Sequence, residues 1–244
     1  MTNSAMAAGP TAAPKPLVGR LLGVLTSPTA AFQAIVAHPK WFGAFTLTTL
    51  VVALFSALPM TTDAGRQATL DQQVAAMKSF GMEVDDRMYE QMERRAASLP
   101  YTTAASIIVI SPIFGLIIAG LLFAVFNAAM GGEASFKQVF SVISHAGIVS
   151  ALSAIFSGTI NYFRGGTGSV ANLGALLPML PEQSFLGNLL GTIDVFLVWY
   201  VLVLAIGLAV LYRRRTRPIA VSLLGVYAVI ALCIAVFKSR VGGA

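Results

Sequence analysis

Five long apolar runs divide this sequence and restrict the chain to folds that form in a membrane. At a rise of 1.5 Å per residue, about 20 residues let a helix cross a hydrocarbon core about 30 Å thick. Backbone groups in lipid must be hydrogen-bonded within their own segment, so we expect helices. The sequence therefore predicts an all-α, polytopic membrane helical bundle over residues 42–237. Its five transmembrane helices cover residues 42–60, 104–126, 139–160, 189–211 and 219–237.

The composition agrees with a membrane-embedded chain. Hydrophobic residues make up 57% of the 244 residues and charged residues 11%, whereas soluble domains carry about 25% charged residues. The net charge of +6 is spread over the segments beside the apolar runs, with no basic patch interleaved with aromatic residues. Nucleic acid is therefore not expected as a partner.

The ends of the chain are predicted to lie outside the bundle. Residues 1–16 are rich in Ala, Pro and Thr and are expected to form a disordered N-terminal tail, and residues 238–244 form a C-terminal tail. Residues 17–41 are predicted to be an amphipathic interfacial segment on the membrane surface, because they are too interrupted to span it. Within them, Ser27 suits an N-cap and Pro28 a first helical position, which predicts a helix over 28–37.

The 61–103 loop separates the first two spans and is predicted to contain two amphipathic helices. Apolar residues recur at spacings of three and four in both halves of the loop, as in Leu70–Val74–Met77 and Val84–Met88–Met92. These helices can form a cap on the bundle or the membrane surface, or the methionines can offer an adaptable binding surface.

Orientation depends on the basic residues beside the spans. The short loop between the fourth and fifth spans carries four arginines, Arg213, Arg214, Arg215 and Arg217. A short loop with this much positive charge is retained on the cytoplasmic side. We interpret the four arginines as a membrane-orienting basic cluster that also contacts anionic head groups. The N-terminus is then cytoplasmic, and the 61–103 loop and the C-terminus are extracytoplasmic.

Signatures of enzymes are missing from the sequence. There are two histidines and one cysteine, too few to assemble a zinc or iron site from these residue types. No nucleophile elbow, phosphate-loop lysine motif or HExxH motif occurs. We therefore expect no catalytic residues, no metal and no cofactor. The glycine-rich stretch RGGTGSVANLG (164–174) lacks a lysine and is expected to be a flexible turn outside the membrane.

The third span carries a polar stripe. Ser150, Ser153 and Ser157 fall on one helical face, and His145 lies closer to the cytoplasmic end. Hydroxyls in membrane helices bond to their own backbone or to a neighbouring helix, or they line a hydrated cavity. His145 is interpreted either as a neutral, hydrogen-bonded core residue or as a proton-relay group.

Asp194 is an acid within the fourth apolar run. Steps of three and four residues place it on a face of small residues with Gly187 and Gly191, which predicts that it faces the bundle. A buried carboxylate needs a partner or a proton. The candidate partners are Arg164, Lys238, Arg240 or the hydroxyls of the third span. Asp194 can be a structural pin, a transport or ligand group, or a residue in contact with water at the start of a shorter span.

Three stretches resemble the bacterial branch of the Yip (Ypt/Rab-interacting protein) family of small five-span membrane proteins. They are GRLLGVLTSPTAAFQAIVAHPKW (19–41), GGEASFKQVFSVISHAGIV (131–149) and IDVFLVWYVLVLAIGLAV (193–210), the last followed by a basic turn. The DLYGP-like motif of eukaryotic members is absent, and Val149 stands where the family has a proline. Rab binding is therefore not carried over. The resemblance implies a cytoplasmic N-terminus and a role in membrane organisation or trafficking.

Together these features predict a non-enzymatic integral membrane protein of the bacterial cytoplasmic (inner) membrane. Its expected partners are membrane lipids and other membrane proteins or further copies of itself. The alternative is a small transporter or channel subunit that uses Asp194, His145 and the serines of the third span.

Overall fold

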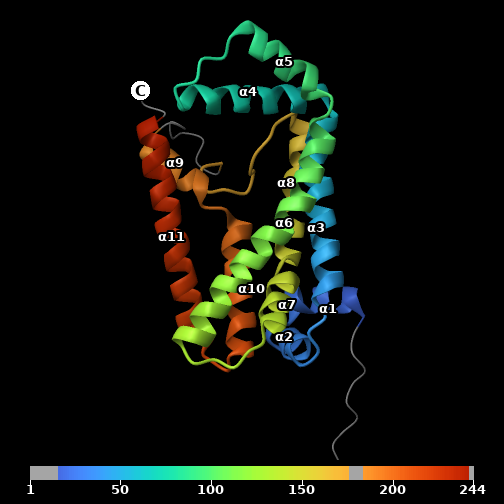
Figure 1. Ribbon diagram of the computed structural model, residues 1–244, viewed down its shortest axis with the longest axis vertical. Helices are drawn as coiled ribbons and strands as arrows, with labels where there is room; N and C mark the ends of the chain where they lie inside the picture. The colour runs from blue at the N-terminus through green and yellow to red at the C-terminus, as the bar shows by residue number, and fades with distance from the viewer. Residues whose placement is uncertain (1–15, 176–183, 242–244) are drawn as a thin grey trace, which may run out of the picture.

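The computed structural model describes residues 16–175 and 184–241, and these residues form a helical bundle without named strands (Figure 1). Four helical stretches are long and apolar enough to cross a membrane: Trp41–Thr61, Leu99–Ala129, Phe136–Arg164 and Thr216–Ser239. They agree with four of the five predicted spans. The predicted tail over residues 1–16 lies almost wholly outside the described residues.

The first two spans follow the prediction closely. Helix α3 (Trp41–Ala57) continues into a 3₁₀ turn (Leu58–Thr61), and α6 (Leu99–Phe123) continues into a π-helical turn (Ala124–Ala129). Only Ala119 is buried along α6, while most of its large apolar side chains are exposed. A helix that is apolar on its exposed face suits a position against lipid.

The third span is divided at Gly147 into α7 (Phe136–Ala146) and α8 (Ile148–Arg164). Ser135 begins α7 through a capping box with Gln138, which satisfies two backbone donors that the helix leaves free. Every residue of α7 from Val139 to Ala146 is buried. Helix α7 is therefore the central element of the bundle.

The fourth apolar run is not a continuous helix. Helix α9 (Phe185–Thr192) ends before Ile193, and α10 (Val195–Leu211) begins after Asp194. The sequence predicted one helical face of small residues through Gly187, Gly191 and Asp194. Because the helix is broken at Ile193 and Asp194, this face does not continue into α10. The fifth run, α11 (Thr216–Val241), packs against both α9 and α10.

The N-terminal helices are part of the bundle. Helix α1 (Leu17–Thr26) buries Leu21 and Val24, and α2 (Pro28–Ala37) buries Phe32 and Ile35 in the same core as α7 and α10. A Cβ atom on Gly207 of α10 would lie 2.5 Å from Val142 Cγ1 and 3.0 Å from Phe32 Cε1. The predicted amphipathic segment is thus confirmed as helical, and its apolar face packs against other helices.

The loop after α3 forms the two predicted helices, α4 (Asp63–Ser79) and α5 (Asp86–Ala96). Asp85 caps α5 by accepting a hydrogen bond of 2.8 Å from the Met88 N–H. Figure 1 shows α4 lying across the end of the bundle, with α5 folded over it. This arrangement matches the interpretation of the loop as a cap.

Candidate functional site

The break between α9 and α10 places irregular backbone within an apolar run, and distant segments satisfy its polar groups. The Tyr227 hydroxyl of α11 donates to the Thr192 carbonyl at 2.9 Å and accepts from the Asp194 N–H at 3.1 Å. Leu173 N–H donates to the Ile193 carbonyl at 2.9 Å, and Val195 N–H donates to the Ala171 carbonyl at 3.0 Å. Irregular backbone is tolerated at membrane depth where such partners exist.

The Asp194 carboxylate has two roles in this arrangement. One oxygen caps α10 by accepting from the Leu197 N–H at 3.0 Å, and the other accepts from the Ser169 hydroxyl. Among the described residues, neither Arg164 nor Lys238 forms an ion pair with it. The side chain of Arg240 lies outside what the structure describes. The partners of Asp194 are therefore a hydroxyl and a helix N-terminus.

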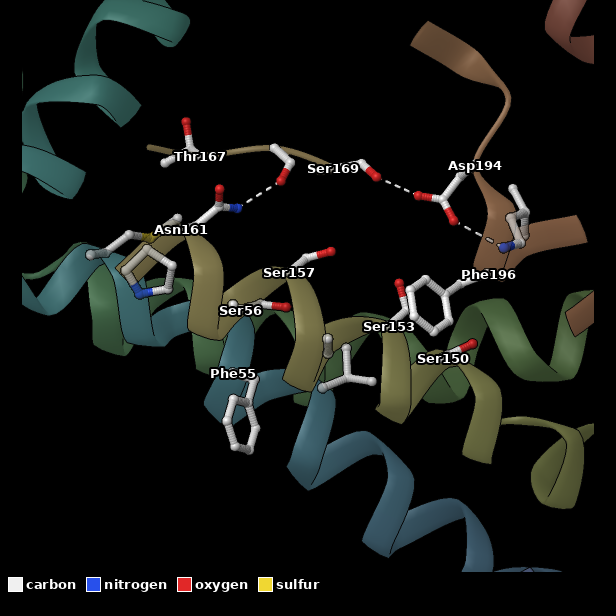
Figure 2. A pocket seen from close by; sticks show the side chains of 17 residues that line it. Phe55, Ser56, Ser150, Ser153, Ser157, Asn161, Thr167, Ser169, Asp194 and Phe196 are labelled. Carbon is white, nitrogen blue, oxygen red and sulfur yellow. Dashed lines mark hydrogen bonds between the residues drawn. The ribbon is translucent and has the colours of Figure 1, made fainter. Parts of the chain in front are cut away.

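A cavity of about 470 Å³ lies beside this break, between α3, α8 and the start of α10. Ser150, Ser153 and Ser157 line it together with Asp194, so the structure brings these predicted polar positions into one site. Figure 2 shows Asp194 and Ser169 facing this row of serines across the cavity. Phe55 and Phe196 also line the cavity, and in Figure 2 the Phe55 ring points away from Asp194 and the serines. Phe196 therefore provides the aromatic wall. The third-span serines thus border a cavity.

Two contacts shape the wall of this cavity formed by α3, α8 and the glycine-rich loop. A Cβ on Gly158 of α8 would lie 2.1 Å from the Phe55 carbonyl oxygen, so the two helices approach backbone to backbone. Asn161 Nδ2 donates to the Gly168 carbonyl at 2.7 Å and holds the loop against α8. The Ser157 Oγ is buried and has no hydrogen-bond partner within the described residues.

His145 is separate from this site. Its side chain is fully buried in the core, and its Nδ1 lies 2.8 Å from the Ser141 carbonyl oxygen. It does not belong to the residues that line the cavity beside Asp194. The position matches the interpretation of His145 as a hydrogen-bonded core histidine.

The four arginines lie at the opposite end of the bundle and are all exposed. Arg213 has a φ of 51°, and the Arg214 guanidinium donates to the Met130 carbonyl at 3.1 Å. Arg213 and Arg214 border a second cavity of about 450 Å³ with Glu133. Burial raises the pKa of Tyr212 in the same cavity, so its phenol stays protonated there.

Sequence reasoning missed two residues and one segment of the site. Tyr227 holds the break from α11, and Ser169 reaches Asp194 from the glycine-rich loop expected to be a flexible turn. Asn172 in that loop forms an isolated antiparallel bridge with Asp194. One available signal was Asp194 itself, because an Asp directly before an apolar run is a helix N-cap signal.

Four long apolar helices, a broken fourth run and an apolar exposed surface define a multi-pass α-helical membrane protein. The Yip1 domain model matches residues 22–237, and the chain belongs to this family. Over 188 residues the chain is 24% identical to membrane protein YknW of Bacillus subtilis (strain 168), covering 77% of this chain and 76% of that protein. No solved structure matches the chain.

Proposed function

We propose that this protein acts without covalent chemistry, in membrane organisation or trafficking, by binding lipids or other membrane proteins. The observation that carries the proposal is the cavity beside Asp194. One carboxylate, several hydroxyls, an aromatic ring and aliphatic side chains line it. Ligand sites of this kind are mostly apolar with a few placed polar groups, and cavities of about 300–1,000 Å³ are typical.

The cavity also lies where a membrane protein presents a ligand site. Its α3 and α8 walls belong to the candidate spans Trp41–Thr61 and Phe136–Arg164. Leu197, at the start of α10, lines the cavity and is 42% exposed, so this part of the cavity wall lies at the molecular surface. A ligand can therefore enter from the surrounding membrane.

Mild extraction and native mass spectrometry test this proposal. A photo-crosslinking residue at Leu197 is expected to give defined lipid or protein adducts, in excess of the same residue at Val229, which is 62% exposed on α11. The native spectra should show lipid or protein that is enriched over the bulk membrane. Equal adducts at both positions, together with no enriched partner, would refute the proposal.

Transport is a second candidate because a broken helix beside a cavity is typical of transporter binding sites. Toward the arginine end of the bundle, the cavity is followed by the fully buried Val149, Ala146 and His145. A pathway would have to open through this layer. Flux through the protein in liposomes that is lost in Asp194→Asn, but kept in Asp86→Asn, would favour transport over binding.

A further inference from the structure

We propose that the cavity beside Asp194 binds the primary ammonium group of an aminophospholipid. This inference rests on the proposed function, in which the chain acts by binding, and it names the ligand class. Asp194 receives the ammonium, and the aromatic and aliphatic side chains of the cavity contact the apolar part of the same lipid.

Charge favours a cation at this site. Among the described residues, Asp194 is the one charged residue in the cavity lining, which contains no lysine or arginine to bind an anion. The N-terminus of α10 offsets part of this charge, but a helix end carries only about half an elementary charge. The site therefore keeps a net negative charge toward a ligand.

The free hydrogen-bonding capacity suits an ammonium group. Asp194 accepts two hydrogen bonds, from Leu197 N–H and from Ser169 Oγ, whereas an ionised carboxylate offers about four acceptor positions. The Ser157 hydroxyl is buried without a partner in the part of the chain that the structure describes, and it can accept a further N–H. An ammonium carries three N–H donors, and the open acceptor positions of the Asp194 carboxylate can receive two of them.

The backbone at the break argues against a bare alkali ion. Carbonyl oxygens are the usual ligands of such ions at broken membrane helices. Here the Thr192 carbonyl accepts from Tyr227, and the Ile193 carbonyl accepts from Leu173. Neither Thr192 nor Ile193 is among the residues that line the cavity, so these two carbonyl oxygens do not add ligands for such an ion there.

The apolar walls favour a lipid over a soluble amine. Val52, Phe55, Phe196 and Leu197 line the cavity and belong to helices in apolar runs. A small soluble amine would satisfy Asp194 but would leave these walls without a contact. An acyl chain that enters past the exposed Leu197 contacts them and removes their apolar surface from water.

The test measures lipid retention by the full chain. The protein is reconstituted into vesicles with equal parts of phosphatidylethanolamine, phosphatidylcholine and phosphatidylglycerol, extracted in mild detergent and analysed by native mass spectrometry. Phosphatidylethanolamine should be retained preferentially, because phosphatidylcholine lacks N–H donors and phosphatidylglycerol lacks the cation. Soluble phosphoethanolamine should displace little of it.

Asp194→Asn removes the charge but keeps a good N-cap, so the start of α10 is preserved. We expect it to lower phosphatidylethanolamine retention about tenfold, the equivalent of about 1.4 kcal/mol for one charge-assisted hydrogen bond. Asp86→Asn makes the same change on the exposed α5 and should retain the wild-type preference. Ser157→Ala should weaken retention, while Ser106→Ala on the exposed side of α6 should not.

A second test varies the lipid and uses only wild-type protein, so a folding defect in a variant cannot affect the result. Retention should fall stepwise as the amine is methylated once, twice and three times, because each methyl group removes a donor or blocks its approach. Equal retention across this series, or of all three lipid classes, would overturn the inference. Retention of another lipid class independent of Asp194 would refute the ammonium site but leave the proposed function standing. The absence of any enriched lipid or protein would refute both.

Discussion

Replacing Gly158 with alanine should separate α3 and α8 and destabilise the bundle. The added Cβ would lie 2.1 Å from the Phe55 carbonyl oxygen and 2.9 Å from its carbonyl carbon. Both are backbone atoms, so no side-chain rotation can relieve the overlap. To restore a contact of about 3.4 Å, the helices have to move about 1.3 Å apart along this line.

The expected cost follows from two opposing terms. Overpacking a filled core costs about 1–3 kcal/mol, and exchanging glycine for alanine within a helix stabilises by about 0.5–1 kcal/mol. We therefore expect Gly158→Ala to lower the free energy of unfolding by about 1 kcal/mol, the difference between the middles of these two ranges. A Cβ atom on Gly120 of α6 would have nothing within 4 Å among the described residues, so Gly120→Ala should be neutral or slightly stabilising.

Unfolding in mixed micelles, followed by far-UV circular dichroism as the denaturing detergent is increased, measures both variants. The two substitutions add the same atom to a helical glycine, and only their surroundings differ. If Gly158→Ala unfolds at the same detergent fraction as Gly120→Ala, α3 and α8 do not make the close backbone contact described above.

Three further predictions concern the break and the orientation of the chain. Tyr227→Phe leaves the Asp194 N–H and the Thr192 carbonyl without this partner, and it should lower the free energy of unfolding by about 1–3 kcal/mol. The control Tyr162→Phe should lower it little. Equal losses in unfolding assays would argue against the hydrogen bonds of Tyr227. Asp194→Ala should lower the free energy of unfolding by about 1 kcal/mol because α10 loses its N-cap, whereas Asp194→Asn should keep the cap and the stability. Equal stabilities of these two variants would contradict the capping role. After replacement of the native cysteine, a cysteine at Glu90 should react with a membrane-impermeant maleimide in intact cells, and one at Arg215 only after permeabilisation. The reverse pattern would invert the predicted topology.

The sequence was sufficient for features that depend on local pattern. Apolar runs of sufficient length predicted the helices at α3, α6, α7–α8 and α11, and spacing within the loop predicted α4 and α5. The serines at positions 150, 153 and 157 share a face because helix periodicity alone places them there. The structure adds that this face borders a cavity.

The break in the fourth run depends on contacts that sequence spacing does not encode. Residues 188–202 are apolar enough for a continuous helix, and the chain leaves helical geometry at Ile193 where other groups can take over the backbone hydrogen bonds. These groups come from Ala171 and Leu173, about 20 residues earlier, and from Tyr227. The loop that supplies the first two looks in sequence like a flexible turn, because its glycines favour no single conformation.

The burial of α2 between α7 and α10 has a consequence for biogenesis. Phe32 is made early in synthesis, yet its side chain packs beside Gly207, which emerges after most of the chain has been made. The apolar face of α2 therefore has to wait at the membrane surface, or on a chaperone, while the intervening spans insert. The packing of α2 is complete only after α10 has been inserted. The first helices to be synthesised are therefore among the last to acquire their final neighbours.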